Sequence, residues 1–183
     1  MDNFFAEVDA PYVVTILSVS RFEEDHLALE RIFCDAEATL YPALRVRIAR
    51  CSEAAGALTI LHSTRMPLVV YDIDERPDRW KQTAREFQGL SAAPCLILSS
   101  RIADDRLCVE AAKHGVYEVL AKPFLDTEVL RIIKMAWLHW QHRYGLPAAE
   151  AEAGKPAAGT QIAPIDVYTP GTPAPKINQC TEE

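Results

Sequence analysis

The sequence lacks the short motifs by which several large enzyme classes are recognised. It has no glycine-rich phosphate loop, no GxSxG motif around a nucleophilic serine and no HExxH zinc motif. Its cysteines form no CxxC pair, and several lie inside predicted strands or helices, where a free cysteine is usually a small core residue, so we expect a reducing cytosol. The five are Cys34, Cys51, Cys95, Cys108 and Cys180.

The chain also lacks a long apolar run and an excess of basic residues. No apolar stretch approaches the length of a membrane span, although 49% of the 183 residues are hydrophobic. The formal net charge is −7, which argues against nucleic acid as the main partner. Residues 1–10 contain three acids and no basic residue, so we do not expect a signal peptide. We expect a cytoplasmic protein that binds neither nucleic acid nor membrane.

Apolar, β-prone stretches alternate with segments of helical spacing. The predicted strands are 13–19, 45–51, 68–72, 95–100 and 116–121, and a looser joint with Pro42 covers 34–44. The predicted helices are 22–33, 53–65 with Ser52 as its cap, 78–90, 104–114, and one from Asp126 or Thr127 to about Tyr144. Five such alternations predict an α/β fold: a doubly wound five-stranded parallel sheet with helices on both faces.

Composition divides the chain into three parts. Residues 1–11 form an N-terminal extension and residues 12–145 the domain. Residues 146–183 are rich in proline and alanine and contain no Trp and no Phe, so we expect a flexible tail that cannot bury enough apolar surface to fold. Within it, the stretch 162–168 (IAPIDVY) is the one that would dock on this domain or on a partner.

Polar side chains end three of the predicted strands. Asp72 ends the third strand, Ser99 with Ser100 ends the fourth, and Lys122 follows the fifth. The carboxyl ends of parallel strands share one edge of a sheet, where ligands bind. A carboxylate, a hydroxyl and an ammonium that converge there suit phosphoryl transfer. The carboxylate would attack phosphorus, and the other two groups would hold the phosphoryl oxygens.

The motifs LVVYD (68–72), CLILSS (95–100) and GVYEVLAKPF (115–124) resemble the receiver domain of two-component response regulators, over roughly residues 12–144. The resemblance implies a flavodoxin-like sheet of order 2-1-3-4-5 and a non-enzymatic signalling role. It implies Asp72 as phosphoacceptor, Ser99 as the hydroxyl that moves on activation, and Lys122 in a cis peptide with Pro123. The implied partners are a sensor histidine kinase or phosphotransfer protein and a downstream protein target, met through the face of the fourth helix, fifth strand and last helix.

The sequence departs from the family pattern at the end of the first strand. Family members have two adjacent acids there that hold Mg²⁺, and this chain has Ser20 and Arg21. Asp72 and Asp74 would remain as ligands of a weak Mg²⁺ site. We expect Arg21 to pair with Asp72, because a guanidinium matches a carboxylate in a two-pronged geometry. The leading hypothesis is an atypical single-domain receiver, and the alternative is a pseudo-receiver scaffold that is never phosphorylated.

The last predicted helix is apolar nearly all round. This pattern predicts a homodimer or a hetero-complex through Met135 or Trp137. His139 and His142 lie one turn apart, and without a third ligand we expect surface residues. The resemblance implies an aromatic residue in the fifth strand at the position of Val119, which is a second departure from the family pattern. Tyr117 lies two residues earlier, on the same strand face.

A remote enzymatic alternative rests on Asp72-Ile73-Asp74, which also resembles the DxD motif of haloacid-dehalogenase-type phosphatases. Those enzymes begin with the DxD strand and need a further strand ending in acids. Here two predicted strands precede the motif, and one helix and a proline-rich tail follow Lys122.

Overall fold

A computed structural model of the chain describes residues 12–37, 44–145 and 167–168. The N-terminal extension, most of the joint around Pro42 and nearly all of the tail therefore lie outside the described residues. No helix in the described ranges is long and apolar enough to cross a membrane.

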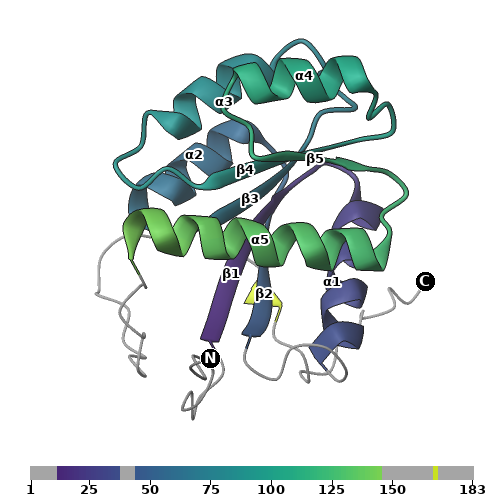
Figure 1. Cartoon of the computed structure of the whole chain (residues 1–183), viewed down its shortest axis with the longest axis vertical. Helices are drawn as coiled ribbons and strands as arrows, with labels where there is room; N and C mark the ends of the chain where they lie inside the picture. The colour runs from purple at the N-terminus through teal and green to yellow at the C-terminus, as the bar shows by residue number, and fades with distance from the viewer. Residues whose placement is uncertain (1–11, 38–43, 146–166, 169–183) are drawn as a thin grey trace, which may run out of the picture.

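The described residues form one central sheet (Figure 1). Its strands are β1 (Tyr12–Val19), β2 (Leu44–Cys51), β3 (Leu68–Asp72), β4 (Cys95–Ser100), β5 (Glu118–Ala121) and β6 (Val167–Tyr168). The first five are parallel and lie in the order 2-1-3-4-5, which confirms the predicted topology. β6 joins the outer edge of β2 in the antiparallel direction.

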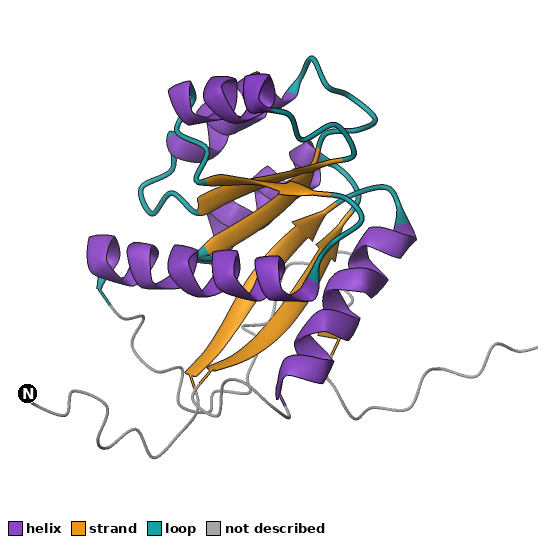
Figure 2. Ribbon diagram, turned by 45° about the vertical axis from the view of Figure 1, so that its right-hand side comes forward, coloured by secondary structure: helices purple, strands orange, loops and turns teal. Residues whose placement is uncertain are grey.

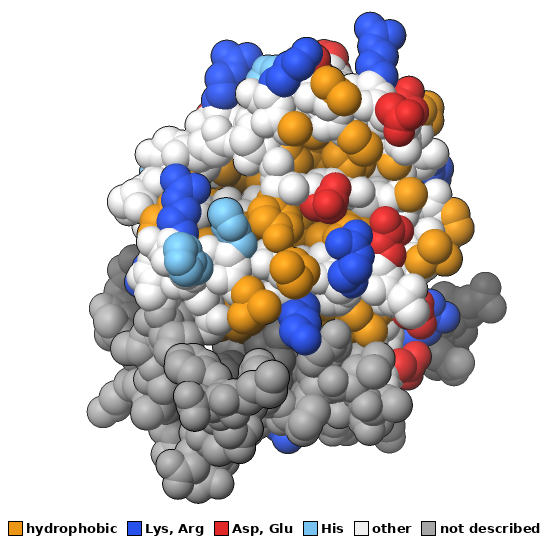
Figure 3. Space-filling view, in the orientation of Figure 1, with side chains coloured by type: hydrophobic (Ala, Val, Ile, Leu, Met, Phe, Trp, Pro, Cys, Tyr) orange, Lys and Arg blue, Asp and Glu red, His pale blue; other side chains and the backbone are white. Residues whose placement is uncertain are grey.

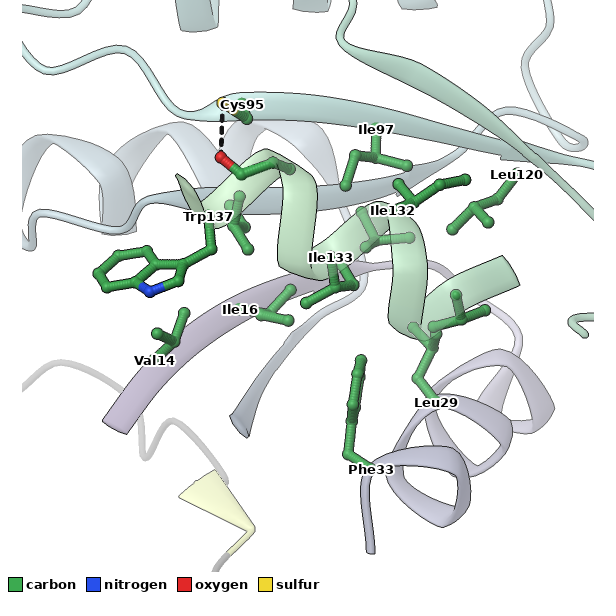
Figure 4. Close-up of a cluster of buried hydrophobic side chains, with 14 of the residues drawn as sticks. Val14, Ile16, Leu29, Phe33, Cys95, Ile97, Leu120, Ile132, Ile133 and Trp137 are labelled. Atoms are coloured by element: carbon green, nitrogen blue, oxygen red, sulfur yellow. Dashed lines mark hydrogen bonds between the residues drawn. The ribbon is translucent and has the colours of Figure 1, made fainter. Parts of the chain in front are cut away.

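Helices cover both faces of the sheet (Figure 2). They are α1 (Glu23–Glu37), α2 (Ala54–Ser63), α3 (Trp80–Gln88), α4 (Asp105–Lys113) and α5 (Asp126–Tyr144). α1 and α5 pack on one face in a core that includes Ile16, Leu29, Ile97, Ile132 and Trp137 (Figure 4). α2, α3 and α4 pack on the other face, in a second core. Since both faces are covered, β3 and β4 are buried along their whole length, as their apolar runs predicted.

Two predicted helix caps are wrong. α2 has Glu53 rather than Ser52 at its N-cap position, and no side chain caps it. α5 begins at Asp126, after Leu125 at the N-cap, so neither Asp126 nor Thr127 caps it. Asp104 does cap α4 by accepting a bond from the Leu107 backbone N–H at 2.7 Å. The observed N-cap positions differ from the predicted ones by only one or two residues. Such a shift still removes the cap, because capping depends on the backbone conformation of a single residue.

The C-terminal half of α5 is anchored by its aromatic side chains. Trp137 is 4% exposed and stacks on Trp140, with ring centroids 5.9 Å apart. Trp140 donates from Nε1 to the Ala93 carbonyl at 3.2 Å, and the Arg65 guanidinium lies 4.8 Å from its ring centroid. Trp137 is therefore part of the core, which rules it out as the expected interface residue. Met135 is 49% exposed and stays available.

The strand β6 comes from the proline-rich segment after the domain. Tyr168 pairs with Ile48 and Val167 pairs with Ala49, both in β2. Two residues of the predicted docking stretch, Val167 and Tyr168, thus pair with this domain, and residues 162–166 lie outside the described residues.

Candidate functional site

The carboxyl ends of β3, β4 and β5 bring together the polar side chains that sequence reasoning selected. Asp72 and Ser99 are register partners, and the Lys122 backbone N–H donates to the Ser100 carbonyl at 2.9 Å. Ser99 is 2% exposed. The peptide bond between Lys122 and Pro123 is cis, as the resemblance implied.

Lys122 lies at the centre of a buried ionic cluster. Its Nζ atom is 2.5 Å from Oδ1 of Asp72, 2.6 Å from Oδ2 of Asp25 and 3.3 Å from Oδ2 of Asp74. The Lys122 side chain is only 5% exposed. A buried ammonium needs such partners, because burying an unpaired charge is costly. One cation thus holds three carboxylates that come from α1, from β3 and from the loop after β3.

Asp25 is the site residue that sequence reasoning missed. It lies in the first turn of α1, where acids commonly serve only to favour the helix N-terminus. Its Oδ2 also accepts a bond from Ser20 Oγ at 2.7 Å. A signal was present in the sequence: Asp25 falls at helical spacing with Leu29, Ile32 and Phe33, which form the buried face of the helix. An acid in line with that face points inward.

Arg21 does not pair with Asp72, and that prediction is wrong. Its guanidinium binds Glu53 at the start of α2 and Glu75 in the loop after β3, the latter at 2.9 Å. The Arg21 side chain is 39% exposed. Asp72 is buried and already holds Lys122, whereas the two glutamates are accessible to a long side chain at the surface. Arg21 therefore bridges two loops at the surface and leaves the carboxylate of Asp72 to Lys122.

Burial and hydrogen bonding set the protonation of the cluster. Burial opposes the charge on Lys122, but its bonds to Asp25 and Asp72 outweigh that effect and raise the pKa of Lys122. Burial raises the pKa of Asp72, although Lys122 acts in the opposite direction. Burial acts in the same sense on Asp74, but bonds from Ser100 Oγ and the Arg101 backbone N–H lower the pKa of that carboxyl. Lys122 is accordingly a permanent cation and Asp74 a permanent anion at neutral pH.

The arrangement does not fit a resident Mg²⁺ ion. Mg²⁺ requires oxygen ligands in a near-octahedral arrangement. Here oxygens of Asp25, Asp72 and Asp74 are directed at the Lys122 ammonium, which takes the position of the cation. No group of three or more His, Cys, Asp or Glu side chains in the described ranges is arranged to hold a metal ion. A weak Mg²⁺ site at Asp72 and Asp74 stays a prediction.

A cavity of about 270 Å³ opens beside Asp72, between α2 and α3. Ser20 and Arg21 line it from the end of β1, and Glu53 and Glu75 line it from the loops that Arg21 bridges. Asp72 is thus reachable from this side, past the Arg21 guanidinium.

The turn that carries Asp25 is held against β1 by a buried histidine. His26 is 4% exposed, and its Nε2 lies 3.0 Å from the Ser20 carbonyl oxygen, which can only accept. Nε2 therefore carries the hydrogen, and Nδ1 accepts from Ser18 Oγ at 2.8 Å. Burial lowers the pKa of His26. The neutral ring fixes the turn on which Asp25 reaches Lys122.

His139 and His142 of α5 belong to no group of three or more potential metal ligands among the described residues. His139 packs on Tyr117, with ring centroids 5.4 Å apart. His142 is exposed. Tyr117 is half-buried, whereas Val119, two residues further along β5, is buried.

No family model matches the sequence, and no curated protein matches it. Solved structures do match. A signal receiver domain of an HD domain-containing protein from Pseudomonas fluorescens is 23% identical, with a TM-score of 0.57 over 71% of this chain and 90% of that one. A response regulator from Thermotoga maritima is 20% identical, with a TM-score of 0.57 over 69% of this chain and 99% of that one. A chemotaxis response regulator of Vibrio cholerae is 14% identical, with a TM-score of 0.55 over 68% and 99%.

The chain therefore has the fold of response regulator receiver domains. At these identities the likeness shows the fold alone, and function must be argued from the site.

Proposed function

We propose that the chain is an atypical receiver-type module of two-component signalling, with Asp72 as its phosphoacceptor. The observation that carries this proposal is the contact of Asp72, at the end of the central strand β3, with the Lys122 ammonium at 2.5 Å. The carboxylate supplies the nucleophile for an aspartyl phosphate, and the ammonium neutralises charge on the phosphoryl oxygens. A sensor histidine kinase or a phosphotransfer protein would supply the phosphoryl group.

Phosphorylation in this pocket is expected to be slow. A complete receiver uses a metal ion to offset the repulsion between its acids and the incoming phosphoryl group, and the residues here do not fit one. Lys122 is shared among three carboxylates, so its charge is already compensated before any donor arrives. The same observation supports the second candidate, a pseudo-receiver scaffold in which the Lys122 cluster keeps the fold in one state.

Both candidates act through protein contact, and α4, β5 and α5 offer the surface. Figure 3 shows hydrophobic side chains gathered on this face, with Lys and Arg side chains around them. Val109 of α4 is 57% exposed, and Met135 and Leu138 of α5 are 49% and 47% exposed. Apolar side chains gathered in this way commonly mark a protein interaction site. We propose this face as the contact for a downstream protein target or for a second copy of the chain.

The phosphatase alternative gains no support from the fold. The motif Asp72-Ile73-Asp74 begins at the end of β3, which is the third strand in the chain and lies inside the sheet. Oδ1 of Asp74 is engaged by Ser100 and by the Arg101 backbone, so the second acid of the motif is not free for acid–base work.

The test is incubation of the full chain with acetyl phosphate and Mg²⁺, followed by intact mass measurement and mapping of the modified residue. We expect slow gain of one phosphoryl group at Asp72 and none in the Asp72→Asn variant. Asp105→Asn is the matched control, because it removes an exposed carboxylate in the first turn of α4 and keeps the cluster around Lys122. If the native chain gained no phosphoryl group from acetyl phosphate or from a phosphorylated histidine protein, Asp72 would not be a phosphoacceptor. The pseudo-receiver scaffold would then be the remaining candidate function.

A further inference from the structure

The connection from β4 to α4 is anchored by one carboxylate outside it. Oδ1 of Asp74 accepts a bond from Ser100 Oγ at 2.7 Å and another from the Arg101 backbone N–H at 2.9 Å. Ser100 Oγ in turn accepts from the Ile102 backbone N–H at 3.0 Å. The first residues after β4 thus take their position from Asp74, which belongs to the loop after β3.

The second oxygen of the same carboxylate faces the ionic cluster. Oδ2 of Asp74 is buried and accepts no hydrogen bond from any described residue. Lys122 Nζ lies 3.3 Å away and carries the charge that compensates it. A buried carboxylate oxygen without a hydrogen bond depends heavily on such a cation. The two oxygens of Asp74 therefore link Lys122 on one side to the β4–α4 connection on the other.

The anchored connection also reaches across the site. The Arg101 guanidinium lies 5.3 Å from the centroid of the Phe22 ring and 3.8 Å from Oε1 of Glu24. Lys122 Nζ lies 5.6 Å from the centroid of the same ring. The Phe22 ring thus lies near both the Arg101 guanidinium and the buried ammonium, and Asp74 holds the backbone from which the Arg101 side chain extends.

We propose that Asp74 is a positioning residue that couples the charge at Asp72 and Lys122 to the β4–α4 connection. Lys122 is shared, so added negative charge at Asp72 draws the ammonium away from Asp74, and loss of charge at Asp72 releases it towards Asp74. When the ammonium moves away, Oδ2 of Asp74 is left buried without compensation. The carboxylate is then stabilised by turning to water, and it releases Ser100 and Arg101 as it does so.

This coupling deepens the proposed function, and it rests on that function only for the event at Asp72 that would drive it. Through Asp74, a change of charge in the pocket would change the position of the connection that leads into α4. The side chains of α4 form part of the proposed contact face. The link can be measured in the unphosphorylated protein.

The experiment is a double-mutant cycle read by amide hydrogen exchange at Arg101 and Ile102 in the full chain, with no phosphodonor present. Lys122→Met removes the cation, and we expect exchange of these two amides to rise about tenfold. In an Asp74→Asn background the residue at 74 carries no charge, and the same substitution should change exchange by less than about twofold. Lys81→Met is the matched control, because Lys81 pairs with Glu110 at 2.6 Å, outside the cluster.

A second variant keeps the test decisive if Lys122→Met does not fold. Asp72→Asn removes a competing carboxylate instead of the cation, so it should slow exchange at Arg101, and only while Asp74 is present. If Asp74 had a purely structural role, Asp72→Asn would not slow exchange at Arg101 while Lys122→Met speeds it. Equal effects of Lys122→Met in both backgrounds, or unchanged exchange at Arg101 in every Lys122 and Asp72 variant, would overturn the proposal. Either result leaves the labelling of Asp72 unaffected, so the two proposals fail separately.

Discussion

Lys122 lies 2.5 Å from Asp72 and 2.6 Å from Asp25, and these contacts decide how the pocket is neutralised. The resemblance implies an acid at position 20, and Ser20 carries no charge, but its hydroxyl donates to Oδ2 of Asp25, the carboxylate that contacts Lys122. The acid expected at the end of β1 is thus replaced by one that enters from α1, a different element. The loss of a charge at one position of a site can be compensated by a residue that lies outside the family's sequence motif but close to the site in space.

Asp25 should contribute to stability as well as to the site. Asp25→Asn removes a charged partner of a buried ammonium, so we expect the free energy of unfolding to fall by about 2 kcal/mol. Glu24→Gln is the matched control on the same turn. The Glu24 side chain is 68% exposed and its ion pair should contribute less than about 0.5 kcal/mol. Urea unfolding of both variants checks this, and equal losses would show that Asp25 is not a specific partner of Lys122.

His26 should make stability depend on pH. Its pKa in the folded state lies below the ordinary value of 6.5, so the unfolded chain binds a proton at higher pH than the folded chain does. The contribution of neutral His26 is therefore complete above about pH 6.5 and is lost as the pH falls below it. Glu23, Asp25 and Arg50 are the charged groups that act on the ring, and Arg50 lowers the pKa whereas the two acids raise it.

Urea unfolding between pH 7 and pH 5 measures this effect. We expect the native chain to lose stability over that range and the His26→Gln variant to lose less. His62→Gln is the control, because His62 is exposed on α2. A His26→Gln variant with the same pH dependence as the native chain would show that His26 is not the responsible group.

At the scale of elements, the hydrophobic pattern predicts more than the polar contacts do. The runs at 68–72 and 95–100 predict β3 and β4 to the residue, because burial on both faces requires an unbroken apolar stretch. The groups at the three strand ends follow from the same pattern. The partner of Arg21 could not be predicted, because a long side chain can reach several carboxylates and only their positions in space decide among them. The prediction that Trp137 lies at an interface was wrong for a similar reason, because the sequence does not show what covers a helix that is apolar all round.

The exposed side of α5 should govern association. Replacing both Met135 and Leu138 by Lys places charge on the apolar face, so we expect the variant to stay monomeric where the native chain associates. Leu27→Lys is the control on α1, since Leu27 is 52% exposed in another part of the surface. Light scattering across a range of protein concentrations gives the mass of each. A native chain that remains monomeric throughout would rule out the homodimer and leave a hetero-complex.

Removal of residues 146–183 should have a small effect on stability. β6 pairs two residues with Ile48 and Ala49, so we expect the thermal midpoint to fall by less than about 4 °C. Hydrogen exchange at the backbone amides of Ile48 and Ala49 should rise if β6 protects them. A much larger fall would mean that the stretch 162–168 contributes more to the domain than these two pairs.

At the scale of the whole molecule, the receiver fold is retained while its pocket is neutralised in another way. The sheet, the strand ends and the cis peptide at Lys122–Pro123 all match the expectation from the resemblance. The pocket differs in its cation, because the protein's own ammonium is surrounded by Asp25, Asp72 and Asp74. This difference bears on both candidate functions, since the ammonium beside the proposed acceptor Asp72 is already shared among three carboxylates.

The most direct test of this account is a titration of Mg²⁺ into the full chain, followed by NMR at the backbone amides of Asp72, Asp74 and Lys122. With Lys122 as the resident cation, we predict no saturable shift of these signals at millimolar Mg²⁺ in the native chain. Replacing Ser20 and Arg21 together by Asp should add two carboxylates and produce a saturable shift. Saturable binding by the native chain at millimolar Mg²⁺ would contradict the claim that Lys122, and not a metal ion, neutralises this pocket.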